Sequence, residues 1–199
     1  GKIKYQALNK KGLAFVRNEQ FENAAAEFEK ALKIDPNSYA TWLNKGLAEV
    51  RIAKLEEALT AFDRATTLKP DSYEALNYKG FVLEDLGRLQ EAVFTFDKAV
   101  KVNKNFIAAL NNKGLVLDKL GKHEEAIEAY NSAIQANPTF DAAWLNMACS
   151  YSLLGERDNM LNSLKKAIDL NPRYKMTLQQ IPDFQNYRND PEFLKLSGR

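Results

Sequence analysis

One motif recurs at a fixed interval along this chain of 199 residues. The stretch TWLNKGLAEV at residues 41–50 returns in altered form as ALNYKGFVLE at 75–84, ALNNKGLVLD at 109–118 and AWLNMACSYS at 143–152. A catalytic motif usually occurs once, whereas a motif written several times at a fixed interval is typical of stacked copies of one supersecondary unit. The period therefore predicts a repeat architecture and not a single compact core.

Four sequence positions keep this period through five repeats, with small, apolar or helix-breaking residues at each, except that Lys104 replaces one proline. They are the series Gly12, Gly46, Gly80, Gly114 and Ala148; Phe28, Phe62, Phe96, Tyr130 and Leu164; Ala31, Ala65, Ala99, Ala133 and Ala167; and Pro36, Pro70, Lys104, Pro138 and Pro172. The repeats accordingly cover residues 5–38, 39–72, 73–106, 107–140 and 141–174.

Each repeat reads as two helices joined by a short turn, as the third repeat illustrates. Asp71 or Ser72 is suited to cap the first helix, and Leu76 and Leu83 share one helical stripe. Gly87 then ends that helix, because glycine tolerates the left-handed conformation found there. The second helix follows at once, so the two must be antiparallel, and the prolines keep successive repeats from fusing.

This pattern resembles the tetratricopeptide repeat (TPR), a helix–turn–helix unit of about 34 residues with a W-x2-L-G-x2-Y…A-x3-F…P signature. The second repeat shows the match best, with Trp42, Gly46, Ala58, Phe62 and Pro70. The resemblance implies an all-α, right-handed superhelical α-solenoid of helix–turn–helix repeats that forms a single domain over residues 1–199. Small residues are expected where helices cross, with the bulky residues beside them.

Residues 175–199 are expected to cap the last repeat with a C-terminal capping helix. The segment from Arg173 predicts a sixth first helix that ends at Pro182, and Asp190 predicts the N-cap of a short helix beginning at Pro191. Four apolar residues are expected to cover the edge of the fifth repeat: Phe184, Tyr187, Phe193 and Leu194. The start on Gly1, at the edge of a helical pattern, suits a fragment of a longer protein.

Three kinds of residue depart from the TPR pattern. Position 7, counted from the first residue of each repeat, usually holds leucine, but here it holds lysines whose ammonium groups are expected to reach water. Glu49 at position 11 and Met160 at position 20 predict two looser junctions. The lysines are Lys11, Lys45, Lys79 and Lys113.

First helices line the concave wall of a TPR array, so the resemblance implies a peptide-binding groove along their outer stripe. Position 9 offers a mainly apolar track, positions 5 and 6 offer many amides, and position 13 offers two arginines. The predicted groove residues are Asn9, Leu13, Arg17, Asn44, Leu47, Arg51, Asn77, Tyr78, Phe81, Asn111, Asn112, Leu115, Asn146 and Cys149.

Asparagine is a mediocre helix former, so its recurrence inside helices asks for a reason. Its carboxamide can donate and accept hydrogen bonds, which suits an extended peptide backbone. Asn44, Asn112 and Asn146 at position 6 resemble the asparagine ladders with which certain TPR arms hold peptide, while Lys10 and Tyr78 interrupt the series. The structural alternative, in which these amides only bond to neighbouring helices, stays open.

A carboxylate clamp for chaperone C-termini is excluded, because its lysine and arginine positions are not matched and Glu74 has the wrong charge. Arg17 and Arg51 stand toward the front, and Glu84, Asp85 and Asp118 stand further back. This distribution favours a peptide that is acidic at one end and basic at the other.

The sequence offers no catalytic residues, metal site or cofactor motif. His123 is expected to be solvated, and Cys149 is expected to fill an apolar slot. The net charge of +2 and the balanced repeats argue against nucleic acid as partner, and no apolar run is long enough to span a membrane. A single cysteine is compatible with a cytoplasmic location.

The expected function is a protein–protein interaction scaffold, not an enzyme, which binds an extended peptide or helix of a partner protein in the groove. The alternative is a self-assembling structural subunit or an oligomerisation module of a larger complex. An enzyme is the third and weakest option.

Overall fold

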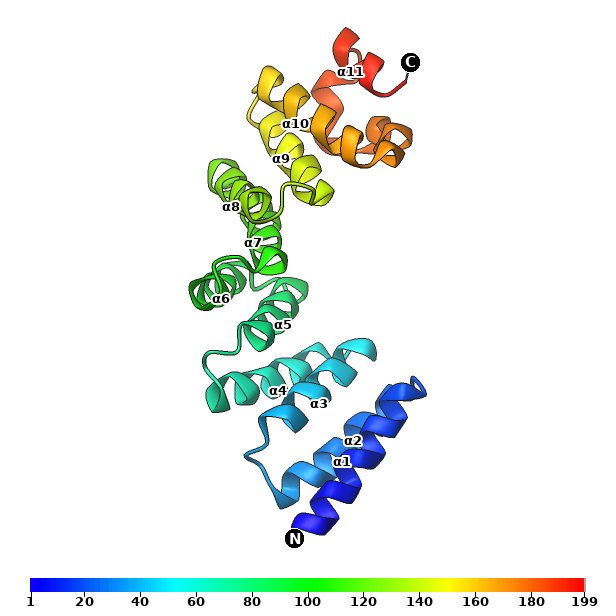
Figure 1. Ribbon diagram of the computed structural model, residues 1–199, viewed down its shortest axis with the longest axis vertical. Helices are drawn as coiled ribbons and strands as arrows, with labels where there is room; N and C mark the ends of the chain where they lie inside the picture. Colours follow the sequence, from blue (N-terminus) through cyan, green and yellow to red (C-terminus); the bar gives the residue numbers. More distant parts are fainter. Residues whose placement is uncertain (199) are drawn as a thin grey trace. The chain divides into compact units, whose positions relative to one another are not determined.

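The computed structural model describes residues 1–198, which form two compact bodies, Gly1–Asn103 and a second that begins at Lys104 (Figure 1). Neither body contains a strand within the described residues, and each consists of antiparallel helical hairpins, which confirms the predicted all-α solenoid. The first body holds α1 (Lys2–Arg17), α2 (Phe21–Ile34), α3 (Tyr39–Arg51), α4 (Leu55–Leu68), α5 (Tyr73–Asp85) and α6 (Leu89–Val102). The second holds α7 (Ile107–Lys119), α8 (His123–Ala136), α9 (Asp141–Leu153), α10 (Arg157–Leu170), three 3₁₀ turns and α11 (Pro191–Leu196).

A glycine and an aromatic ring hold each of the first four hairpins together. In the second hairpin, a Cβ added to Gly46 would lie 2.6 Å from the ring of Phe62, which is fully buried. Only a residue without a side chain therefore permits this approach of the two helices. The same pair recurs as Gly12 with Phe28, Gly80 with Phe96, and Gly114 with Tyr130.

The fifth hairpin changes both members of this pair. Ala148 and Leu164 stand at the two positions, and both are fully buried in one apolar cluster. The added methyl group of the alanine is thus accompanied by a smaller partner on the second helix. This concerted change keeps the packing density that a helix crossing requires.

Hairpins stack within each body through small residues on the second helices. Helix α2 packs on α3, α4 on α5, and α8 on α9. The alanines expected at these crossings are fully buried: Ala24, Ala31, Ala58, Ala65, Ala92, Ala99, Ala126, Ala133 and Ala167. Close packing of neighbouring helices through small apolar side chains therefore stabilises each stack, which has no single central core.

The turn inside each hairpin requires a left-handed residue. Gly87, Gly121 and Gly155 supply it with φ of 77°, 76° and 74°. The backbone N–H groups that follow the helix bond back to its last carbonyl groups, as in the predicted end of α5 at Gly87. The first two hairpins use Glu19 and Ala53 instead, each at φ 59°, where a Cβ is strained.

Proline loops join successive hairpins. The indole N–H of Trp42 donates to the carbonyl of Pro36 at 2.7 Å, and Trp144 repeats this bond to Pro138 at 2.9 Å. Ser72, and not Asp71, caps α5 by accepting a hydrogen bond from the backbone N–H of Ala75. The loops therefore end one helix and start the next with specific hydrogen bonds.

The C-terminal segment covers the last hairpin, but it contains no sixth first helix. It forms 3₁₀ turns η1 (Pro172–Met176), η2 (Leu178–Gln180) and η3 (Pro182–Tyr187) before α11. The predicted helix fails because only nine residues separate two prolines, and Ile181 before Pro182 is extended with ψ 117°. Met176 is accordingly 81% exposed.

Several contacts nevertheless hold this segment against α9 and α10. Phe184 and Phe193 are fully buried, with ring centroids 5.4 Å apart. Arg157 on α10 grips Asp190 with two hydrogen bonds of 2.6 and 3.0 Å, and Asp190 caps α11 as predicted. The prediction that Met160 loosens its junction is wrong, because Met160 is fully buried in the apolar cluster that these phenylalanines complete.

Glu49 is a buried carboxylate in α3, where other repeats place an apolar side chain. Its Oε2 forms an ion pair with the ammonium group of Lys45 and accepts a hydrogen bond from it at 2.9 Å. Its buried Oε1 has no hydrogen-bond partner within residues 1–198. Burial raises the pKa of Glu49, and the nearby Lys45 opposes this shift. The position is therefore a local weakness of the kind predicted, electrostatic in origin.

Candidate peptide-binding groove

In the first body, the predicted groove residues belong to α1, α3 and α5, where positions 5, 9 and 13 share one face of each helix. Position 9 holds Leu13 and Leu47, both half-buried, and Phe81, which is 42% exposed. Steps of four residues on a helix keep positions 5 and 9 on this face. The first body therefore presents an apolar track whose side chains reach solvent.

The second body presents a shorter version of the same stripe on α7 and α9. Leu115 and Cys149 occupy position 9, and both are half-buried. Asn111, Asn112 and Asn146 lie beside them on the preceding turn of each helix and are half-buried too. The stripe here is less apolar and more amide-rich than in the first body.

Asn146, Asn111 and Asn9, all predicted groove residues, form hydrogen bonds within the molecule. The amide N–H of Asn146 donates to the carbonyl oxygen of Asn111 at 3.0 Å, linking α9 to α7. The hydroxyl of Thr41 donates to the side-chain oxygen of Asn9 at 2.9 Å. An amide offers two donors and an acceptor, so each group keeps hydrogen-bonding capacity after forming one such bond. The amides thus join first helices together and still present polar atoms to the groove.

Tyr78 and Arg51 both contact rings of the first body. The Tyr78 ring stacks on the buried Phe62 at 5.8 Å between centroids, with the planes 20° apart. Arg51 lies over the ring of Phe21 at 4.3 Å. These contacts fix two exposed groups in place, which lowers the entropy lost when a partner binds them. Arg17 lies exposed in the last turn of α1, where a cation suits the helix dipole.

Asp118 is an internal hydrogen-bond acceptor and not a groove charge. It accepts bonds from Tyr130 at 2.8 Å, from His123 at 2.8 Å, and from Ser150 at 2.7 and 2.9 Å. The prediction that His123 is solvated is therefore wrong, since its ring is held by this carboxylate and is mostly covered. Spacing gave no signal for the cluster, because its members come from three different helices.

Cys149 fills the apolar slot expected for it. Burial raises the pKa of its thiol, with Asp183 and Asp118 adding to the shift. The thiolate is the reactive form of cysteine, so this environment disfavours nucleophilic chemistry at neutral pH. Cys149 is a free, half-buried cysteine.

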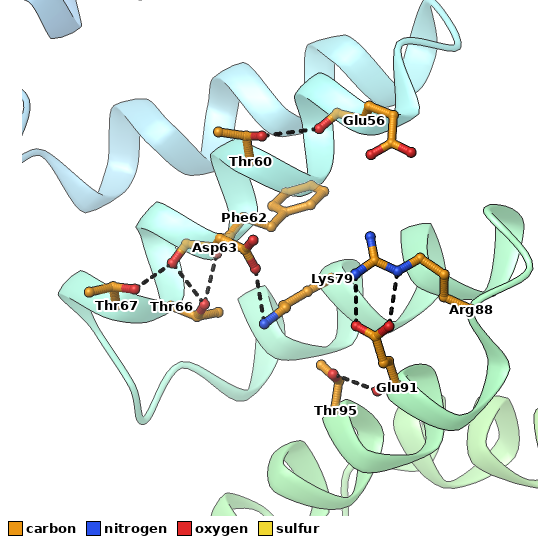
Figure 2. A network of polar contacts seen from close by, with 10 residues as sticks. All are labelled: Glu56, Thr60, Phe62, Asp63, Thr66, Thr67, Lys79, Arg88, Glu91 and Thr95. Atoms are coloured by element: carbon orange, nitrogen blue, oxygen red, sulfur yellow. Dashed lines mark hydrogen bonds and ion pairs between the residues drawn. The ribbon is translucent and has the colours of Figure 1, made fainter.

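Three of the lysines at position 7 lie within ion-pair distance of a carboxylate. Lys79 on α5 pairs with Asp63 on α4 at 3.0 Å, as Figure 2 shows, and Lys45 pairs with Glu49. Lys11 lies 3.8 Å from Glu27. The expectation that these ammonium groups reach water is corrected for Lys45 and Lys79, whose side chains are mostly covered, whereas the Lys11 side chain is 61% exposed.

Residues 1–198 bring together no group of three His, Cys, Asp or Glu side chains that could hold a metal ion. Among the helices of that range, none has both the length and the apolar content needed to cross a bilayer.

Solved structures with the same fold are numerous. A crystal structure of MamA shares 28% identity, covers 82% of this chain and 95% of its own, and superimposes with a TM-score of 0.79. A second MamA structure shares 26% identity, covers 91% and 98%, and gives 0.82. YrrB, described as a TPR protein with an unusual peptide-binding site, shares 24% identity over 87% and 89%, with a TM-score of 0.76. A comparison with curated proteins finds no match.

Sequence models of the tetratricopeptide repeat match nearly the whole array. The matched segments are residues 5–38, 43–106, 107–140 and 141–174. They coincide with the helical hairpins and their Gly–aromatic pairs, and the similar folds of MamA and YrrB agree with this assignment. The chain therefore belongs to the tetratricopeptide repeat family.

Proposed function

We propose that this protein is a non-catalytic interaction scaffold whose first helices bind an extended peptide or a helix of a partner protein. The observation that carries the proposal is the apolar stripe of the first body, where Tyr78 is 38% and Phe81 42% exposed. Large apolar side chains that gather on one face of a protein usually mark an interaction site. Leu13 and Leu47 extend the stripe on α1 and α3.

Amides beside the stripe suit the backbone of such a peptide. Asn44 is half-buried on α3, and its side chain has no hydrogen-bond partner within the described residues. A bound peptide strand would supply the N–H and C=O groups that this amide can pair with. Arg17 and Arg51 add positive charge at one edge, which favours a peptide with a carboxylate at that end.

Peptide selection with direct binding measurements tests this proposal. A displayed library of random peptides is selected on the full chain, and the winning peptide is titrated by fluorescence anisotropy. Phe81→Ala should weaken binding about tenfold or more, as expected for a buried aromatic anchor. Phe94→Ala is the matched control, because Phe94 is 62% exposed on the second helix α6, outside the stripe.

An Asn44→Ala variant measures the amide contribution separately, and a loss of about threefold to tenfold is expected for one peptide hydrogen bond. Equal affinity of the wild type and the Phe81→Ala and Asn44→Ala variants would rule out the groove. Light scattering at increasing protein concentration decides the alternative of self-assembly, which predicts a rising molar mass.

A further inference from the structure

A second cleft lies in the C-terminal body, away from the first-helix stripe. Helix α10, turn η1 and helix α11 enclose about 670 Å³, a size within the range of small-ligand sites. The C-terminal segment already buries the apolar residues beneath the cleft, since Leu161 is 7% and Ile168 5% exposed. The groups that a ligand can reach are therefore mainly the polar side chains of the rim.

The rim of this cleft carries lysines from three different elements. Lys165 lies on α10, Lys175 on η1 and Lys195 on α11, and all three are exposed. None of them forms an ion pair within residues 1–198. Asn162 on α10 also lines the cleft, and its carboxamide has no hydrogen-bond partner in the described part of the chain. Hydrogen-bond donors from three elements thus border one cleft without an acceptor.

Two carboxylates also line the cleft. Glu192 lies 3.3 Å from the guanidinium of Arg157, which compensates part of its charge. Asp169 follows Lys165 by about one helical turn, but the two form no ion pair within residues 1–198. The lining keeps an excess of positive charge even when both carboxylates are counted.

The corresponding cleft of the first body provides partners for its own lysines. It lies where α5 packs on α4, with a volume of about 640 Å³, and Lys79 there pairs with Asp63 at 3.0 Å (Figure 2). Its other lysine, Lys98, lies over the ring of Phe94 at 4.6 Å. In the last repeat Lys165 occupies the position of Asp63, so a cation replaces the acid. The excess charge is therefore particular to the cleft on α10.

We propose that this cleft binds a phosphate group, with Lys165, Lys175 and Lys195 as its donors. A phosphate monoester carries a charge of about −1.5 to −2 at pH 7 and three strong acceptor oxygens. Lysine binds such a group as a point charge and donates hydrogen bonds from its ammonium group. A single carboxylate would neutralise only one lysine, so the number of lysines favours phosphate as the ligand. This site uses none of the groove residues and goes beyond the proposed peptide binding.

Titration of the full chain, followed by two-dimensional NMR at constant ionic strength, tests the site. The two probes are sodium pyrophosphate and a short phosphoserine peptide, and the same peptide with unmodified serine is the control ligand. At least one phosphate probe should bind saturably and shift the amide signals of α10, η1 and α11. Whichever binds more tightly identifies the source of the phosphate, a free phosphate compound or a phosphorylated partner protein.

Two substitutions in the lining should change the affinity in opposite directions. Lys165→Gln should weaken binding about threefold to tenfold, because one charge-assisted contact is lost. Asp169→Asn should strengthen it about twofold or more, because a charge that repels the ligand leaves the cleft. Lys166→Gln is the matched control, since Lys166 is exposed beside Lys165 but does not line the cleft, and it should leave the affinity unchanged.

Circular dichroism verifies that the variants fold. The proposal is overturned if neither phosphate probe binds saturably, if the serine peptide binds as tightly as the phosphoserine peptide, or if Lys166→Gln weakens binding as much as Lys165→Gln. Binding to phosphatidylserine vesicles that both lysine variants weaken equally would also overturn it, because the lysines would then belong to a general membrane-facing surface. Phe81→Ala should leave the phosphate affinities unchanged, so a failure here is separate from a failure of the groove.

Discussion

The first two hairpins and the last hairpin share one backbone pattern but differ in the strain of their turns and in the packing of their buried side chains. Helices α1 to α4 turn through Glu19 and Ala53 at positive φ, whereas the turn between α9 and α10 uses Gly155. Glu49 leaves a buried oxygen unpaired in α3, whereas Met160 in α10 completes an apolar cluster with Phe193.

This difference teaches that a repeat array can hold uneven local stability within a uniform backbone pattern. Each hairpin contacts only its neighbours, so a strained turn or an unpaired carboxylate weakens its own hairpin first. The N-terminal hairpins should therefore exchange amide hydrogens faster than the last hairpin and its cap.

Removing the cap's main anchor should abolish the advantage of the last hairpin. Phe193→Ala leaves a cavity in a fully buried site, so it should lower the free energy of unfolding by about 3–5 kcal/mol. Urea denaturation measures the loss, and hydrogen exchange should place it in α9 and α10. Phe94→Ala, at an exposed site, serves as control with little change expected; equal losses in both variants would contradict the packing described here.

Removing the partner of Glu49 should deepen the weakness of the N-terminal hairpins. Lys45→Met strands a buried carboxylate, so it should destabilise the protein by about 3 kcal/mol at neutral pH. Combining it with Glu49→Leu replaces the pair by apolar residues that occur at these positions elsewhere in the chain, and stability should return to the wild-type level or above. Denaturation of both variants and of Glu49→Leu alone gives the coupling energy of the pair.

The pH dependence of stability should have opposite sign in the two regions. The pKa of Glu49 is raised mainly by burial, so its protonated form is favoured by folding, and this contribution is lost as pH rises through the folded pKa. The pKa values of Asp141 and Asp190 are lowered by hydrogen bonds from Asn171 and Arg157 respectively, so their contributions are lost as pH falls through the folded pKa values. Exchange rates resolved by residue should show mild acid protecting α3 and stronger acid loosening the cap.

Placing the Ala and Leu of the fifth hairpin at the Gly46 and Phe62 positions of the second hairpin tests whether each Gly–aromatic pair packs as one unit. Gly46→Ala should cost about 1–3 kcal/mol, because the new methyl group meets the Phe62 ring. Adding Phe62→Leu should recover part of that loss, as the pair Ala148 and Leu164 implies. Losses that simply add in the double variant would show that the two positions are independent.

The smallest expected effect comes from the strained turns. Ala53→Gly should stabilise the protein by about 0.5–1 kcal/mol, since glycine adopts φ 59° without a steric penalty and this gain exceeds its added unfolded-state entropy. Gly155→Ala should change stability in the opposite direction. Thermal denaturation compares the stabilities of the two variants. A destabilised Ala53→Gly variant would contradict the view that the turns at Glu19 and Ala53 weaken the N-terminal hairpins.

Periodic features of the fold could be predicted from the sequence, because one packing rule fixes them five times. The buried series from Phe28 to Leu164 and the turn at Gly87 follow from spacing and glycine chemistry alone. The segment after Pro172 could not be predicted in the same way, because it occurs once and its 3₁₀ turns depend on two nearby prolines and on the surface beneath them.

The candidate site shows the same limit. Helical spacing indicates which face holds Leu47 and Phe81, but it cannot tell whether an amide faces a partner or a neighbouring helix, and the bond from Asn146 to Asn111 is visible only in three dimensions. Asp118 was assigned to a charged surface for the same reason. Its partners His123, Tyr130 and Ser150 converge only through folding.

Both halves of each Gly–aromatic pair lie inside a single repeat, sixteen positions apart. A gene segment that is duplicated or deleted in whole repeats therefore keeps both members of each Gly–aromatic pair together. The packing between the two helices of a hairpin is then unchanged. Arrays of this kind can change length by duplication without passing through a misfit intermediate, whereas a cut of any other length would separate a ring from the space that receives it.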